Sequence, residues 1–169
     1  IPSTVVINEK EIDVVRIPKY AFTNYDDYSG IYEGYSSLTS VEIPNSVKII
    51  ERGAFAYSYN LSSVVFEEKS QLTSIGESAF EECSALKSIE IPASVTRIEN
   101  SAFRCSKLKK IVFEENSQLT SIGGGAFARC TSLTNVKIPS SVTRIEDCAF
   151  EECSSLPKVV FEENSQLTS

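Results

Sequence analysis

The sequence predicts a solenoid of stacked coils in which parallel β-strands pair from one coil to the next. The main observation is a repeat, because an isoleucine, three variable residues and then Ala-Phe occur six times. After a first gap of 33 residues, the copies recur every 25, 23, 24 and 23 residues, and a fixed period of this length is typical of a repeat protein. The copies are Ile17/Ala21/Phe22, Ile50/Ala54/Phe55, Ile75/Ala79/Phe80, Ile98/Ala102/Phe103, Ile122/Ala126/Phe127 and Ile145/Ala149/Phe150.

Each unit opens with a short segment of the pattern L-x-x-I-x-I. Its last apolar residues alternate with a variable residue, which is the periodicity of a β-strand. One coil cannot bury so many apolar side chains against itself, so neighbouring coils must stack roughly 4.8 Å apart, with their strands parallel. The six copies begin at Leu38, Leu61, Leu86, Leu108, Leu133 and Leu156.

The units alternate between two forms, Ile-Pro-x-Ser-Val and Phe-Glu-Glu-x-Ser-Gln-Leu. Proline directly after the strand fixes the start of the turn. The alternation also separates Glu67, Glu114 and Glu162 by about 10 Å, near the Debye length, so repulsion between them is largely screened.

The length of 169 residues fits one domain of about seven coils. Residues 1–22 are expected to form a degenerate N-terminal coil, with Val5 and Ile7 in its strand. Residues 23–37 are a tyrosine-rich insertion, and residues 38–169 are regular alternating repeats of 23–25 residues. The last unit stops before its Ala-Phe, which predicts truncation of a longer array and end-to-end self-association through the uncapped C-terminal coil.

The insertion carries Tyr25, Tyr28, Tyr32 and Tyr35. Tyrosine gives a large, rigid contact area at low entropic cost, which favours a recognition loop. The alternative, favoured because exposed apolar edges must be covered, is that the rings fold over the first coil. Both interpretations remain open from the sequence.

Composition argues against several classes of function. The net charge of -7 disfavours nucleic acid as a partner, and the apolar runs are too short to span a bilayer. There are no histidines, which removes the commonest general base and the usual zinc ligand. We therefore expect no catalytic residues, no metal and no cofactor, and we predict that the protein is not an enzyme.

The cysteines follow the repeat. Cys83, Cys105, Cys130 and Cys153 are expected to occupy one column of successive coils, where Ser58 stands in an earlier coil. Small buried groups would fill this column, although neighbouring Cα atoms could also fall within disulfide range. Cys148 lies at a different position of the repeat and is expected to reach solvent.

The strand residues that point away from the core are the candidate ligand-binding residues, because the concave sheet is the usual working face of a curved solenoid. Valine at three of these positions is explained equally well by strand propensity alone. The candidates are Glu42, Val65, Glu90, Lys110, Val112, Asn135, Lys137, Lys158 and Val160, with the loop tyrosines Tyr25, Tyr28, Tyr32 and Tyr35.

From Val14 onward, the pattern L-x-x-I-x-I-P-x-S-V-T-x-I-x-x-x-A-F-x-x-C-x-x-L closely resembles the BspA-type leucine-rich repeat, also called the Treponema pallidum type. The resemblance implies a right-handed leucine-rich-repeat solenoid with a parallel sheet on its concave face and short strands and 3-10 turns on its convex side. It also implies a secreted or cell-surface protein, often an adhesin that binds host matrix proteins or microbial surface proteins. The family carries no shared catalytic residues.

The leading hypothesis is a non-catalytic protein-binding or adhesion module, extracellular or at the cell surface, that binds macromolecules through the concave sheet. The alternatives are a passive structural spacer and an intracellular protein-interaction scaffold. No nucleic acid and no membrane insertion are expected.

Overall fold

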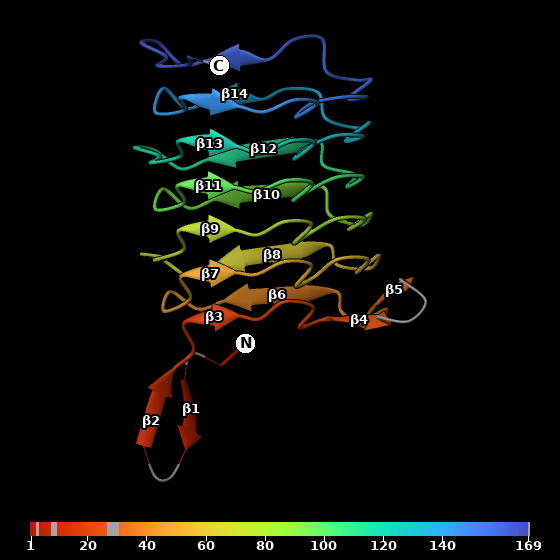
Figure 1. The fold of residues 1–169 in the computed structure, drawn as a ribbon, viewed down its shortest axis with the longest axis vertical. Coiled ribbons are helices and arrows are strands. Elements are labelled where there is room, and N and C mark those ends of the chain that lie inside the picture. Colours follow the sequence, from red (N-terminus) through yellow and green to blue (C-terminus); the bar gives the residue numbers. More distant parts are fainter. Residues whose placement is uncertain (3, 8–9, 27–30, 169) are drawn as a thin grey trace.

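The structure, a computed structural model, describes residues 1–2, 4–7, 10–26 and 31–168 and shows a parallel β-solenoid (Figure 1). Each turn carries a first strand on one side of the stack and a second strand on the opposite side, joined by tight turns. The described residues contain no helix. The predicted fold class is therefore confirmed.

The first strands are the predicted L-x-x-I-x-I segments, and they pair in parallel as β6–β8, β10–β12 and β14–β16. We call the solvent-facing side of these strands the first-strand face. The strands are β6 (Ser40–Ile43), β8 (Ser63–Phe66), β10 (Ser88–Ile91), β12 (Lys110–Phe113), β14 (Lys137–Ile138) and β16 (Val160–Phe161).

The second strands hold the isoleucine that precedes each Ala-Phe. They form one six-stranded parallel sheet in the order β15-β13-β11-β9-β7-β3. The strands are β3 (Arg16–Ile17), β7 (Ile49–Ile50), β9 (Ser74–Ile75), β11 (Arg97–Ile98), β13 (Ser121–Ile122) and β15 (Arg144–Ile145).

The number of turns is smaller than predicted. Five turns carry both strands, from β6–β7 to β14–β15, whereas about seven coils were expected. Within the described residues, β3 has no first strand of its own turn. Val5 and Ile7 were assigned to that strand, but β1 (Thr4–Ile7) pairs antiparallel with β2 (Lys10–Asp13) in a hairpin that extends away from the stack (Figure 1).

The core consists of columns of identical residues. The phenylalanines of the repeat stack face to face from one turn to the next, with ring centroids 4.9 to 5.4 Å apart and interplanar angles of 3° to 13°. The four central rings, Phe55, Phe80, Phe103 and Phe127, are fully buried. The column adds aromatic contact to an apolar burial worth on the order of 2 kcal/mol per side chain.

The segment around each Ala-Phe consists of successive tight turns closed by hydrogen bonds between residues three apart, as in the predicted 3-10 turns, and they do not merge into a continuous 3-10 helix. In the turn that includes Phe55, the Ala54 and Ala56 N–H groups donate to the carbonyls three residues earlier. Gly53 and Tyr57 have φ angles of 61° and 59°. These left-handed residues interrupt the right-handed backbone, so a continuous helix cannot form.

The two alternating unit forms complete each other through a hydrogen bond that charge spacing alone does not predict. The carboxylate of each Phe-Glu unit accepts the backbone N–H that follows the Ile-Pro of the preceding turn. The pairs are Asn45 to Glu67 at 3.1 Å, Ala93 to Glu114 at 2.8 Å and Ser140 to Glu162 at 3.0 Å. Each pair satisfies a donor just beyond the end of a strand.

Candidate binding surface

The outward row of the first-strand face alternates charged and aliphatic side chains. Strand register places Glu42 beside Val65, Glu90 beside Val112, and Lys137 beside Val160. Because β8 lies beside β10, Val65 of the first pair is next to Glu90 of the second. Alternation of residues along each strand sends this row to solvent and its neighbours to the core.

Exposure along this row is uneven. Val65 is 51% exposed and Val160 is 40% exposed, and both are among the most exposed large apolar side chains described. Val112, which was expected to be exposed like them, is partly buried. The charged candidates Glu42, Glu90 and Lys137 are exposed.

A second row lies at the start of the same strands, and it changes character along the stack. Ser40, Ser63 and Ser88 occupy it in the first three turns, and Lys110, Asn135 and Lys158 occupy it in the next three. Ser88 pairs with Lys110, and Lys110 forms a parallel bridge with Asn135. All of the predicted strand candidates therefore lie on one surface.

The surface is shallow. Lys137 lines a wide, open hollow of about 480 Å³ with Phe161 and Glu162 near the C-terminal end of the stack. Val65 and Glu90 line a depression of about 120 Å³ that also includes Phe66 and Glu114. Such a depression is smaller than sites that enclose small ligands, which typically measure 300–1,000 Å³. The geometry suits a flat contact with a macromolecule.

The tyrosine-rich insertion forms a second antiparallel hairpin, β4 (Thr23–Asp26) and β5 (Ile31–Gly34), in which Tyr25 pairs with Tyr32. Tyr28 lies outside the described residues. Tyr35 is 46% exposed, and its N–H donates to the Phe22 carbonyl, which ties the insertion to the first ring of the phenylalanine column.

Two further tyrosines stand near the insertion. The rings of Tyr57 and Tyr59 meet edge to face at 6.1 Å, and Tyr59 is 48% exposed. Burial, followed by the nearby Glu81 and Glu82 carboxylates, raises the pKa of Tyr57. Tyr57 therefore stays neutral at physiological pH.

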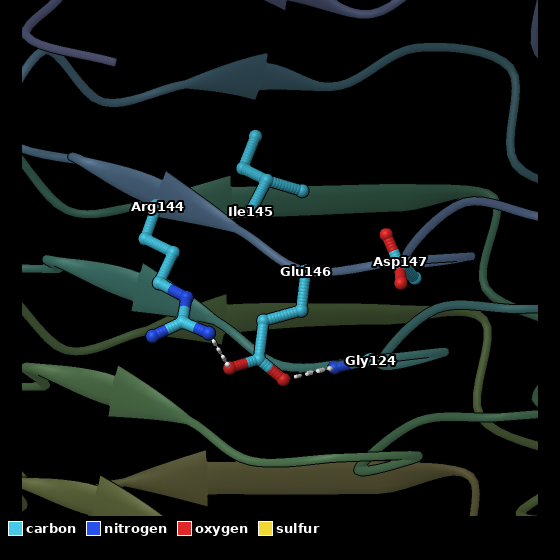
Figure 2. Close-up of a pocket in the computed structure, with 5 residues that line it drawn as sticks. All are labelled: Gly124, Arg144, Ile145, Glu146 and Asp147. Carbon is cyan, nitrogen blue, oxygen red and sulfur yellow. Dashed lines mark hydrogen bonds and ion pairs between the residues drawn. The ribbon is translucent and has the colours of Figure 1, made fainter. Parts of the chain in front are cut away.

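Another opening, of about 410 Å³, lies on the opposite side, at the outermost strand β15 (Figure 2). Arg144 and Glu146 form an ion pair at 3.2 Å, and Glu146 also accepts the Gly124 N–H at 3.3 Å. Asp147 points away from this pair (Figure 2). Because Glu146 binds both Arg144 and the Gly124 N–H, the arrangement ties β15 to the preceding turn.

The cysteine column differs from the predicted one. All five cysteines are free thiols. Cys83, Cys130 and Cys153 are buried and donate to the carbonyls of Phe55, Phe103 and Phe127 in the preceding turns. The fourth position is filled by the buried Ser106 and not by Cys105, which is partly exposed with a φ of 58°.

One missing residue explains this difference. The chain spends five residues from Phe103 to Leu108, but six from Phe80 to Leu86. Stacking of the phenylalanines holds the residues just after Phe103 in the same place as in the other turns. The connection is therefore one residue shorter between Ser106 and Leu108. Counting back from the leucine therefore assigns the wrong residue to the column.

The thiols of Cys83 and Cys130 are poor nucleophiles, whereas the hydrogen bond with Cys130 lowers the pKa of Cys153. Burial raises the pKa of Cys83 to about 12. The neighbouring Cys153 thiol, together with burial, raises the pKa of Cys130 as well. Cys148, in contrast, is exposed as predicted.

Among the described residues, no three Cys, Asp or Glu side chains gather as a metal site. The described part of the chain also lacks any helix that is long and apolar enough to cross a membrane. Three lysines near the first-strand face, Lys87, Lys107 and Lys109, were missed by the sequence reasoning. They become visible when the repeats are aligned on their leucines.

The stacked parallel turns and their columnar core define a leucine-rich-repeat solenoid. The model of the BspA type leucine rich repeat region matches residues 15–157 in six copies. The chain belongs to this family. A comparison with curated proteins finds no match.

Solved structures agree with this assignment. The pneumococcal vaccine antigen PcpA is similar with a TM-score of 0.85 and 34% identity, over 98% of this chain and 40% of that protein. A leucine rich cell surface protein from Faecalibacterium prausnitzii is similar with a TM-score of 0.69 and 30% identity, over 95% of this chain and 46% of that protein. The T. pallidum leucine rich repeat protein has a TM-score of 0.56 and 28% identity, over 94% of this chain and 55% of that protein.

The chain thus spans less than half the length of the first two of these proteins. Its fold is of a general protein-interaction kind. The family is generally non-catalytic.

Proposed function

We propose that the chain is a non-catalytic adhesion module that binds protein partners through its first-strand face, outside the cell or at its surface. The observation that carries the proposal is the outward row of this face, where Val65, Val112 and Val160, the first and last of them exposed, alternate with exposed charged side chains over six strands. Isolated exposed apolar residues are common on protein surfaces. A row of valines can form apolar contacts with a partner protein, and the charged side chains beside it can fix how that partner is positioned.

The relatives support the compartment. One of the similar structures is described as a cell surface protein and another as a vaccine antigen. Both descriptions fit a module exposed to the exterior of a bacterium. Matrix proteins of a host and surface proteins of other microbes are the partner classes that we propose.

The proposal can be tested with the double variant Val65→Asp/Val160→Asp. Binding of the chain to immobilised collagen, fibronectin and laminin would be measured by biolayer interferometry. We expect the chain to bind at least one of them and the double variant to lose at least about tenfold in affinity, because each aspartate places an unpaired charge in the contact.

Val15→Asp is the matched control, because Val15 is 42% exposed but lies outside the first-strand face. Circular dichroism would confirm that all variants keep the fold. Equal loss in the control, or the absence of binding to every matrix protein and to intact microbial cells, would instead favour a passive spacer. Intracellular scaffolding would be favoured if the native gene lacked an export signal.

End-to-end self-association is a separate proposal, supported by the exposed Phe161 and Leu167 at 38% and 39% exposure. Sedimentation velocity of the 169-residue chain would show a concentration-dependent dimer. Phe161→Ser/Leu167→Ser should reduce it, whereas an unchanged monomer at all concentrations would refute it.

A further inference from the structure

The edge of the solenoid from which the first strands start has an unusual composition. We call it the strand-start edge and define it as the residues from two before to two after each repeat leucine. No acidic residue occurs in it, although the chain has 23 acidic residues and a net charge of -7. The segments are 36–40, 59–63, 84–88, 106–110, 131–135 and 154–158.

Five lysines lie on this edge, and all five are exposed: Lys87, Lys107, Lys109, Lys110 and Lys158. The stacking places them side by side. The Lys109 N–H donates to the Lys87 carbonyl at 2.8 Å, and Lys107 reaches Thr131 of the following turn at 3.4 Å. Four of the five therefore lie on two adjacent turns.

None of these five lysines has a carboxylate of a described residue within 4.0 Å, since the only lysine ion pair of the described chain joins Lys137 to Glu162. Acidic residues gather instead where the first strands end, as Glu67, Glu68, Glu114, Glu115, Glu162 and Glu163.

Two of the acidic groups near the strand-start edge are held in ion pairs with arginines. Glu81 pairs with Arg104 at 2.8 Å, and Glu152 pairs with Arg129 at 3.0 Å. Glu82, Glu90 and Glu151 have no described ion pair. The edge is thus a local positive strip on an acidic molecule, and the two edges of the first-strand face carry opposite charge.

We infer that the strand-start edge binds an anionic polysaccharide that carries sulfate or carboxylate groups. The positive groups are lysines, which act as point charges for a flexible anion. Ser88, Thr134 and Asn135 stand between them and can exchange hydrogen bonds with sugar hydroxyls. Exposed Tyr35 and Tyr59 extend the edge toward the N-terminal turns.

The same residues disfavour nucleic acid. The four turns from Lys87 to Lys158 contribute the edge segments 84–88, 106–110, 131–135 and 154–158. These segments contain neither arginine, which would bind phosphate in a bidentate manner, nor an aromatic residue on which bases could stack. From the turn of Lys87 to that of Lys158 the distance is roughly 14 Å, three strand spacings. A short linear oligosaccharide can span this length in one extended conformation.

The decisive measurement is the affinity of the 169-residue chain for heparin, with hyaluronan, neutral dextran, duplex DNA and polyglutamate as separate arms. At about 50 mM salt we expect binding to heparin and none to dextran, with an affinity that falls steeply as salt increases. Heparin and hyaluronan distinguish sulfate from carboxylate as the preferred group.

Lys107→Gln/Lys109→Gln/Lys110→Gln should weaken heparin binding by at least about tenfold and flatten its salt dependence. Lys19→Gln/Lys48→Gln/Lys69→Gln is the matched control, because it changes the net charge equally at exposed lysines outside the strip. The control should bind within about twofold of the unmodified chain. All six side chains are exposed, so both variants should retain the circular dichroism spectrum.

The assignment is wrong if the unmodified chain does not bind heparin or hyaluronan, if both triple variants lose affinity equally, or if DNA or polyglutamate binds as tightly. The outcome can be distinguished from that of the adhesion proposal, although Lys110 and Lys158 belong to both surfaces. Val65→Asp/Val160→Asp should keep its heparin affinity, since those valines lie outside the strip.

Discussion

At the scale of single residues, the position of a side chain in its column determines how much it contributes to the free energy of unfolding. A ring in the middle of the phenylalanine column contacts the ring above and the ring below, whereas Phe150 has one described ring neighbour and is only partly buried. Identical residues in identical motifs therefore contribute differently.

Phe103→Ala should lower the free energy of unfolding by about 3–5 kcal/mol, because it removes a fully buried ring and opens a cavity between two turns. Phe150→Ala should cost clearly less. Urea titration followed by circular dichroism measures both. Equal losses would show that the rings do not stabilise each other through the stack.

Thiol reactivity should also depend on position. At about pH 8, Cys148 should react with a maleimide within minutes, whereas Cys83 should stay protected in the folded chain, because its pKa is raised to about 12. Mass spectrometry of tryptic peptides would identify the labelled residue. Labelling of Cys83 before Cys148 would contradict the burial of the thiol column.

The raised Cys83 pKa also predicts a pH dependence of stability. The unfolded state loses this proton near its ordinary pKa of 9.0, while the folded state retains it to about 12. Stability from this group is therefore complete below pH 9 and declines as the pH rises toward 12. Cys83→Ser should reduce that decline in alkaline urea titrations.

At the scale of the repeat element, the two unit forms are linked by side chains that bond to the backbone of the preceding turn. Besides the glutamate bonds, a threonine hydroxyl of each turn donates to the preceding turn at 2.9 to 3.2 Å. The donors are Thr73, Thr96, Thr120, Thr143 and Thr168. These bonds fix the register between neighbouring turns.

Glu114→Ala should destabilise the chain by about 1 kcal/mol, because the Ala93 N–H loses a charged acceptor at a partly solvated site. Glu115→Ala is the control, since Glu115 is exposed at the adjacent position and has no described hydrogen bond. Thermal unfolding distinguishes the two. Equal melting temperatures would show that water replaces the carboxylate without loss.

At the scale of the whole molecule, stability is expected to fall from the middle of the stack toward its ends. Ile75, Ile98 and Ile122 are buried between two second strands each, whereas Ile145 in the outermost strand is only partly buried. Solenoids unfold through such ends because each turn contacts only its neighbours.

Native-state hydrogen exchange should therefore show the strongest protection in β9 and β11, with weaker protection in β15 and β16. Peptide-resolved mass spectrometry on the 169-residue chain measures this gradient. Uniform protection along the stack would indicate that the turns unfold as one cooperative unit.

The sequence by itself determined the solenoid, its strand positions and its outward row, because a fixed period assigns each position of a coil to the core or to solvent. Ile98, Phe103 and Leu108 are buried as their spacing requires. The candidates Glu42, Lys137 and Val160 likewise face solvent, since residue alternation along a strand leaves no other arrangement.

Only the tertiary structure decided what depends on contacts between turns. The bond from the Ala93 N–H to Glu114 and the stacking of Ser106 beside Cys130 join residues of neighbouring turns that no local pattern brings together. The lysines of the strand-start edge also come together only through stacking, because a spacing of 22 residues in the chain becomes one strand spacing in the fold. The period of the sequence determines whether a residue faces the core or solvent within its own coil, whereas the register between coils determines which residues of the neighbouring coils it contacts.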